Sequence, residues 1–168
     1  MMIPVNDKHP QIGENCFVAP NATLVGDFRC GDFCSFWFNA VVRADVNSIS
    51  MGHHSNIQDG AVIHCTYQQT ETRIGNYVSI AHNAVVHGCT LEDEVMVGIN
   101  AVVLDRAVVS SGTLIAAGAV VLEGAKLEPN SVYAGTPAKK IKDISEVNQE
   151  MMQRIANNYT MYASWFQK

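Results

Sequence analysis

Apolar residues recur every six positions through most of the chain, a spacing that fits neither an α-helix nor an alternating β-strand. Each unit reads an aliphatic residue, often a glycine, two polar residues, a small or branched residue and one free position. Short repeats of this kind are typical of parallel β-helices, in which each unit supplies one short strand and one turn. From residue 97 the phase is unbroken, and the leading residues are Val97, Val103, Val109, Ile115, Val121, Leu127 and Tyr133.

The phase of the repeat predicts how the units stack. Three units would close one triangular coil, so the leading residues would point inward as ladders, with successive coils about 4.8 Å apart. The fifth positions are small from Ala101 to Ser131, as a close-packed interior requires. The sequence therefore predicts an all-β solenoid, a parallel β-helix. The same phase upstream gives Ile57, Ile63, Ile74, Ile80 and Val86.

The repeat is interrupted once and then replaced near the C-terminus. Residues 65–73 are polar and out of phase, which predicts a loop projecting from one corner of a coil. Ser145 is a good helix N-cap with Glu146 in the first turn, so we expect an amphipathic helix over 145–166 that packs on the solenoid. The chain then divides into a β-helix domain, 1–144, and a helical segment, 145–168. The predicted apolar stripe of the helix is Val147, Met151, Ile155, Tyr159, Ala163 and Phe166.

Composition narrows the classes of partner. The formal charge of −5 and a pI near 5.6 argue against binding to nucleic acid. No apolar run is long enough to span a membrane and no signal-peptide pattern is present, so we expect a cytoplasmic protein without a membrane partner. Cys30 and Cys34 fall on positions for small apolar residues, which predicts reduced interior thiols. Cys65 and Cys89 lie near histidines, and a ligand role for them stays open.

Three histidines, His64, His82 and His87, lie within 24 residues of the repeat. Three imidazoles with one open position are typical of a catalytic zinc site, although Fe²⁺ or Co²⁺ would suit the same ligands. If the loop replaces one face of a coil, Ile63 and Ile80 share a face. That arrangement places His64 and His82 on neighbouring coils and His87 on the next face. Because outward groups on adjacent faces diverge, we expect the site to need a second chain, as in a symmetric trimer.

A polar cluster lies just upstream of the histidines. Arg43 could form a salt bridge across a subunit boundary with either Asp45 or Asp59. Gln58 carries a neutral amide, which can orient a metal-bound water by hydrogen bonding.

The segments 42–47 and 56–64, followed by His82 and His87, resemble the motifs of the gamma-class carbonic anhydrases. The resemblance runs from about residue 12 to residue 138 and implies the left-handed form of the β-helix. It implies that all three histidines are zinc ligands in a homotrimer, with His82 supplied by the neighbouring subunit. It also implies conversion of CO₂ to bicarbonate.

The same resemblance implies roles for the residues around the metal. Arg43 would pair with Asp59 at the trimer interface, and Gln58 would hold the metal-bound water. Asn56 and Asp45 would complete the polar network, and Tyr159 would reach the site from the helix.

Two departures from the family pattern bear on activity. Val46 stands where the best-characterised members have a glutamate, and Glu71 is the sole carboxylate of the short 65–73 loop. We therefore expect metal binding with weak or absent CO₂ hydration, limited by proton export.

Two other functions are compatible with the repeat. Many hexapeptide-repeat proteins are acyltransferases that use acetyl-CoA and a single histidine as general base. A non-catalytic subunit of a larger assembly is the other alternative. The spacing of the three histidines and the motif at residues 56–60 favour the metal enzyme over the acyltransferase, and the non-catalytic subunit stays open.

Overall fold

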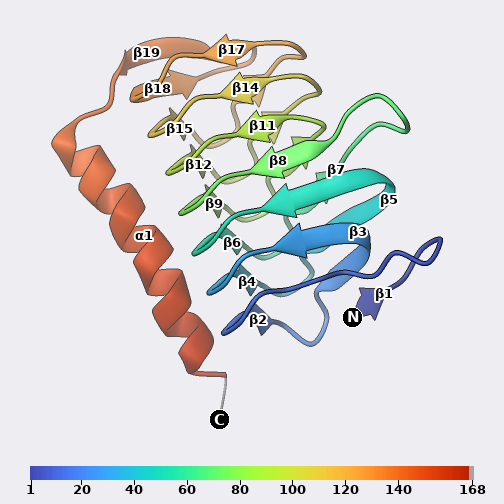
Figure 1. Cartoon of the computed structure of the whole chain (residues 1–168). Helices are drawn as coiled ribbons and strands as arrows, with labels where there is room; N and C mark the ends of the chain where they lie inside the picture. Colours follow the sequence, from blue (N-terminus) through green and yellow to red (C-terminus); the bar gives the residue numbers. More distant parts are fainter. Residues whose placement is uncertain (167–168) are drawn as a thin grey trace.

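The computed structural model describes residues 1–166 and shows a stack of triangular β-coils flanked by one helix (Figure 1). The strands stack in parallel from coil to coil, which confirms the β-helix that the six-residue repeat predicts. Each coil has three faces. They are named A, B and C in the order in which the chain passes through them. The corners between them are the A–B, B–C and C–A corners.

Two long strands wrap around the A–B corner and connect the sheets of faces A and B. They are β3 (Thr23–Cys30) and β5 (Val41–Met51), and β1 (Met2–Ile3) pairs with β3. Face A continues with β7 (Val62–His64), β10 (Val85–His87), β13 (Val102–Val103) and β16 (Val120–Val121). Face B continues with β8 (Thr72–Ile74), β11 (Thr90–Leu91), β14 (Val108–Val109) and β17 (Lys126–Leu127).

Face C is a separate sheet of shorter strands. It comprises β2 (Phe17–Val18), β4 (Ser35–Phe36), β6 (Asn56–Ile57), β9 (Ser79–Ile80), β12 (Met96–Val97), β15 (Leu114–Ile115), β18 (Ser131–Ala134) and β19 (Lys139–Asp143). The last strand, β19, runs antiparallel to β18 and was not predicted, because residues 139–143 are exposed and carry no repeat pattern.

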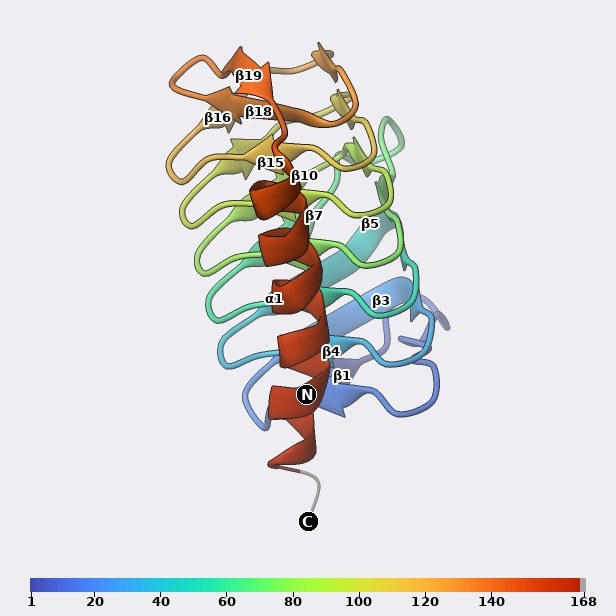
Figure 2. The ribbon, with the colours of Figure 1, turned by 90° about the vertical axis from the view of Figure 1, so that its left-hand side faces the viewer.

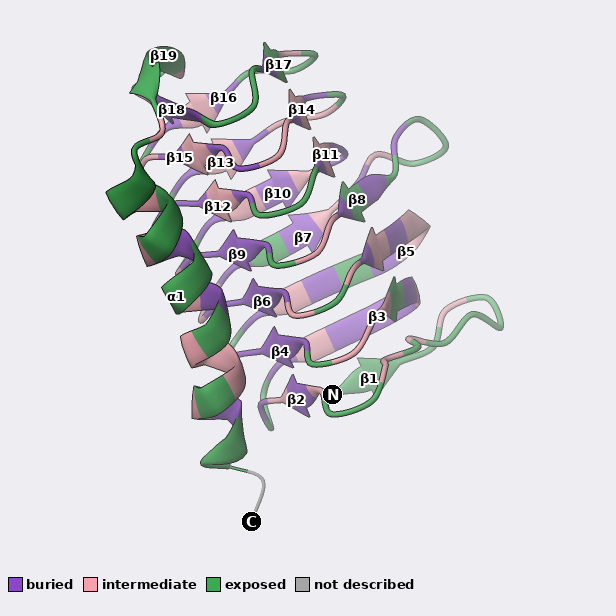
Figure 3. Cartoon of the chain, turned by 60° about the vertical axis from the view of Figure 1, so that its left-hand side comes forward, coloured by how far each residue is buried: buried purple, intermediate pink, exposed green. Residues whose placement is uncertain are grey.

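The leading residues form inward ladders, which fill the interior with buried apolar side chains. In Figure 3 the face C strands β4, β6 and β9 are coloured as buried along their whole length. The prediction that Ile63 and Ile80 share a face is wrong. Ile63 stacks on Val86 in face A, whereas Ile80 stacks on Ile57 and Val97 in face C. The reason is that the loop after β7 adds residues at the A–B corner instead of replacing a face. The loop itself projects as predicted (Figure 1).

Helix α1 (Glu146–Ser164) runs along face C and contacts β4 and β9 (Figure 2). The Ser145 side chain accepts a hydrogen bond from the backbone N–H of Asn148, which confirms the predicted N-cap. The predicted stripe is wrong at its start, since Val147 is 74% exposed. Residues 167 and 168 of the predicted helical segment lie outside the described residues. Of the predicted stripe Ala163 is buried, whereas Phe166 is 52% exposed; the other buried helix residues, Met152 and Ala156, lie outside the stripe. No helix within residues 1–166 has the length and apolar character needed to cross a membrane.

Candidate metal centre

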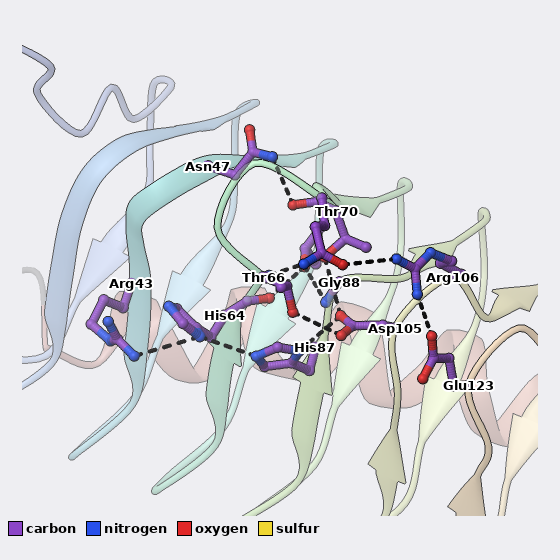
Figure 4. Close-up of polar contacts among 12 residues, drawn as sticks. Arg43, Asn47, His64, Thr66, Thr70, His87, Gly88, Asp105, Arg106 and Glu123 are labelled. Atoms are coloured by element: carbon purple, nitrogen blue, oxygen red, sulfur yellow. Dashed lines mark hydrogen bonds and ion pairs between the residues drawn. The ribbon is translucent and has the colours of Figure 1, made fainter.

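His64 and His87 occupy matching positions on adjacent coils. They end β7 and β10 at the A–B corner, and the strand register pairs them directly. The Nδ1 atom of His64 lies 3.1 Å from the Nε2 atom of His87 (Figure 4). Both side chains are mostly buried, 16% and 29% exposed. Two of the three predicted ligands are therefore brought together by parallel stacking alone.

A carboxylate lies against the outer nitrogen of each ring. His64 Nε2 is 3.2 Å from Asp45 Oδ1, and His87 Nδ1 is 2.9 Å from Asp105 Oδ1. Each outer nitrogen can therefore be the protonated one and donate a hydrogen bond to its carboxylate. The two inner nitrogens then keep their lone pairs, which face each other. Facing lone pairs repel unless a proton or a metal ion lies between them. The Arg43 guanidinium, 3.5 Å from the inner nitrogen of His64, is the donor already beside this pair.

This arrangement fits a zinc ion. Zinc–nitrogen bonds of about 2.0–2.1 Å in a tetrahedral site separate ligand nitrogens by roughly 3.3 Å. The inner nitrogens of His64 and His87 are 3.1 Å apart, so only a small adjustment is needed. Histidine ligands commonly donate their second N–H to a carboxylate, which fixes the ring and makes it more basic. Asp45 and Asp105 are placed for that function.

Asp105 is not among the site residues predicted from the sequence. Its carboxylate accepts hydrogen bonds from the hydroxyls of Thr66, at 2.8 Å, and Thr70, at 3.1 Å, both on the projecting loop (Figure 4). Asp105 follows His87 by 18 residues, which is three repeats or one full coil. Extending the repeat by one coil from His87 would have found it.

Gly88 makes room for this carboxylate. Its backbone has φ +57°, and an added Cβ would collide with the Asp105 carboxylate and the Thr70 hydroxyl. The projecting loop is also held from both sides, because Asn47 donates to the Thr70 carbonyl and Arg106 donates to Gln69. The loop hydroxyls thus orient the Asp105 carboxylate, and the absence of a side chain at Gly88 leaves the space that this carboxylate occupies.

Hydrogen bonds lower the pKa of both carboxyl groups and so keep them ionised. Burial alone would raise the pKa of Asp45, but hydrogen bonds from Arg43 and His64 outweigh it and hold that pKa below its usual range. The pKa of Asp105 is lowered in the same way, with burial opposed by bonds from Thr66 and His87. Burial, followed by the Arg43 charge, lowers the pKa of His64, which favours the neutral imidazole that a metal ion requires.

The remaining predicted site residues lie at the C–A corner. His82 and Asp59 occupy successive turns there, and His82 Nδ1 is 3.0 Å from Asp59 Oδ2. Gln58 is buried and donates to Asn56, whose own amide donates to Ser79. His82 lies in the turn that precedes β10 and His87 ends β10, so the strand of face A separates them.

Tyr159 reaches this second corner from α1. Its ring packs edge-on against Trp37 at 5.2 Å, and it lines a groove with Asp59. Burial, followed by the nearby Asp59 charge, raises the pKa of Tyr159 to about 12, so its hydroxyl remains a hydrogen-bond donor at neutral pH.

The predicted site residues therefore form two half-sites. The first half-site holds Arg43, Asp45, His64 and His87, and the second holds Asn56, Gln58, Asp59, His82 and Tyr159. Within residues 1–166 the three histidines do not come close enough to share one ion. The expectation that His64 and His82 share a face on neighbouring coils, with His87 on the next face, is wrong, because the loop extends a corner and places His87 in register with His64. In one chain Arg43 pairs with Asp45 at 2.5 Å, and Asp59 contacts His82.

Sequence relatives agree with the motifs. A candidate carbonic anhydrase of Methanocaldococcus jannaschii is 42% identical over 151 residues, which cover 90% of this chain and 92% of that protein. The mitochondrial gamma carbonic anhydrase 1 of Arabidopsis thaliana is 36% identical over 167 residues, which cover 96% of this chain. The chain spans only 61% of the length of that plant protein. No family model matches the chain.

Solved structures agree with the fold. A candidate acetyltransferase of Bacillus cereus superposes with a TM-score of 0.96 at 31% identity, covering 99% of this chain and 96% of that one. A hexapeptide transferase family protein of Anaplasma phagocytophilum has a TM-score of 0.94 at 33% identity, covering 99% of this chain and 98% of that one. Fold and site together define a hexapeptide-repeat β-solenoid with histidine–carboxylate clusters at its corners. By its sequence relatives, the chain belongs to the gamma carbonic anhydrase family.

Proposed function

We propose that this protein is a trimeric zinc enzyme that catalyses the reversible hydration of CO₂ to bicarbonate. The observation that carries the proposal is the facing pair of His64 and His87 nitrogens, 3.1 Å apart, with a carboxylate behind each ring. Zn²⁺ held by three imidazoles would lower the pKa of a bound water to about 7 and so supply hydroxide as the nucleophile at neutral pH.

The third ligand, His82, comes from a second chain. It lies at the C–A corner, so a neighbouring coil stack must bring its C–A corner against the A–B corner of the first chain. A closed threefold ring repeats that contact at each interface and completes three equivalent sites. In the ring Asp59 leaves its contact with His82 and pairs with Arg43 of the adjacent chain.

The other residues orient the reactants. Asp45 and Asp105 hold the two imidazoles in the tautomer that offers the inner nitrogen to the metal. The Gln58 amide, itself held by Asn56, provides a fixed donor and acceptor at the second half-site for the attacking oxygen. The Tyr159 hydroxyl adds a donor near the substrate.

Proton export is the weak step. Val46 is apolar, and Glu71 on the loop is bound by Arg73 at 2.8 Å, which lowers the pKa of Glu71 and makes it a poor proton acceptor at neutral pH. We therefore assign a low rate of hydration in dilute buffer. We also assign a cytoplasmic location, since Cys34, Cys65 and Cys89 are buried free thiols that a reducing compartment preserves.

Metal content and hydration rate test the proposal together. We expect about one imidazole-bound Zn²⁺ per chain and a trimer by light scattering, both measured on purified protein. That ion should be lost in His82→Ala and retained in His9→Ala, a change at an exposed histidine. Stopped-flow CO₂ hydration should depend on the bound metal, and Co²⁺ or Fe²⁺ replacement identifies the ion that gives the highest rate. Acetyl transfer from acetyl-CoA without metal, or full metal content in His82→Ala, would overturn it. An inactive metal-loaded trimer would favour a non-catalytic assembly subunit.

A further inference from the structure

Three cysteines meet at the B–C corner, away from both half-sites. Cys16, Cys30 and Cys34 place their sulfur atoms within 4.8 Å of one another. Cys30 ends β3, Cys34 comes directly before β4, and Cys16 comes directly before β2. Phe17 pairs with Ser35, so Cys16 and Cys34 occupy matching positions on successive coils. Parallel stacking therefore concentrates the thiols, as it does the imidazoles at the A–B corner.

The cluster is both shielded and accessible. Cys34 is buried, whereas Cys16 and Cys30 are partly exposed, so an ion can enter from the surface near the end of the solenoid. At present the sulfurs of Cys16 and Cys34 contact the backbone carbonyls of Gly31, at 3.3 Å, and Gly52, at 3.0 Å. Hydrogen bonds from the neighbouring thiols lower the pKa of Cys16 and raise those of Cys30 and Cys34, because one thiolate is stabilised by the remaining S–H groups.

We propose that Cys16, Cys30 and Cys34 form a second metal site, which binds one thiophilic cation, Zn²⁺ or Cu⁺, through three sulfurs. Thiolates select these ions over harder cations. Zinc–sulfur bonds of about 2.3 Å in a tetrahedral site separate sulfurs by roughly 3.8 Å, so the cluster closes by at most about 1 Å on binding.

The site stabilises the end of the solenoid. Face C ends at β2, whose outer edge has no further strand beyond it among the described residues. Terminal coils of repeat proteins need capping, because only one neighbour packs on them. An ion bound by Cys16 from the first coil and by Cys34 from the second would connect these coils and oppose fraying.

Cadmium titration of the reduced apoprotein tests the site, since cadmium–thiolate charge-transfer absorption reports sulfur ligands and not imidazoles. We expect about one such complex per chain in the unmodified protein and in His82→Ala, and its loss in Cys16→Ser and Cys30→Ser. Cys89→Ala is the matched control, because Cys89 is a buried cysteine outside the cluster. The His82→Ala arm makes the result independent of the proposed histidine centre.

Two further measurements complete the test. Zn²⁺ and Cu⁺ are each added to the cadmium complex, and displacement identifies the preferred ion. The bound ion should also raise the thermal midpoint of the unmodified protein but not that of Cys16→Ser, whose folding is checked by circular dichroism. No thiolate absorption in the unmodified protein, or undiminished absorption in a folded Cys16→Ser, would overturn the proposal.

Discussion

His64 and His87 are 23 residues apart in the chain, yet they lie in direct register on adjacent strands, with ring nitrogens 3.1 Å apart. The coil normally repeats after 18 residues, as from His87 to Asp105. The projecting loop after β7 accounts for the difference. It lengthens one coil at its corner without shifting the strands, and it delivers Thr66 and Thr70 to the Asp105 carboxylate.

The separation of the half-sites leads to a complementation test. His64→Ala and His82→Ala should each abolish metal binding at the histidine centre, since each damages every interface of a homotrimer. Each mixed trimer should recover function at one of its three interfaces, where two intact half-sites meet, which is about one interface in four over a random equal mixture of the two chains. Co-refolding the two variants and measuring zinc content checks this. No recovery in verified mixed trimers would contradict a metal site shared between two chains.

Asp105 should control metal affinity. Asp105→Asn keeps the size of the side chain but removes the charge that fixes His87, so we expect zinc affinity to fall about 10–100-fold with the fold retained. Asp27→Asn, an exposed aspartate paired with Lys8, is the control and should bind zinc normally. Competition with a chromophoric chelator measures both affinities. Equal affinities would show that Asp105 does not support the ligand.

Gly88→Ala should disturb the metal site in two ways, by backbone strain at a positive φ and by a clash of the new Cβ with the Asp105 carboxylate. Gly118 offers a matched control, because it also has a positive φ, +68°, but no atom lies within 4 Å of an added Cβ. Each substitution should destabilise by about 1–2 kcal/mol from backbone strain. Only Gly88→Ala should also weaken zinc binding, by displacing Asp105. Denaturant unfolding and zinc titration of both variants separate the two effects.

Val46→Glu should increase CO₂ hydration in dilute buffer. Val46 is partly buried directly after Asp45, so a carboxylate there would receive the proton that Glu71, held by Arg73, accepts poorly. Well-placed acid–base groups contribute about 10²–10⁴-fold, and we expect a gain toward the lower end.

Buffer dependence provides the control for this prediction. Concentrated imidazole should raise the rate of the unmodified protein and have less effect on Val46→Glu, because the buffer carries the same proton. Stopped-flow assays across buffer concentrations measure both. A high rate that is independent of buffer in the unmodified protein would show that another group exports the proton.

Periodicity alone determined a large part of this structure. The six-residue repeat predicted the β-helix and its inward ladders, since the side chain at each leading position is buried in every coil. The polar interruption predicted the loop, and Ser145 predicted the start of the helix. The repeat did not indicate which face of α1 is buried. Met152 and Ala156 fit against face C, and that choice depends on the surface opposite and not on the helix itself.

Only the tertiary structure decided which residues share a corner. The sequence identified His64, His82 and His87 by residue type, but it could not show whether the inserted loop replaced a face or extended a corner. That choice moves His87 beside His64 and leaves His82 across face A. The gathering of Cys16, Cys30 and Cys34, and of Asp105 with His87, is likewise fixed by coil register. Register is a property of strands paired across many residues, so it appears only once the chain has closed its coils.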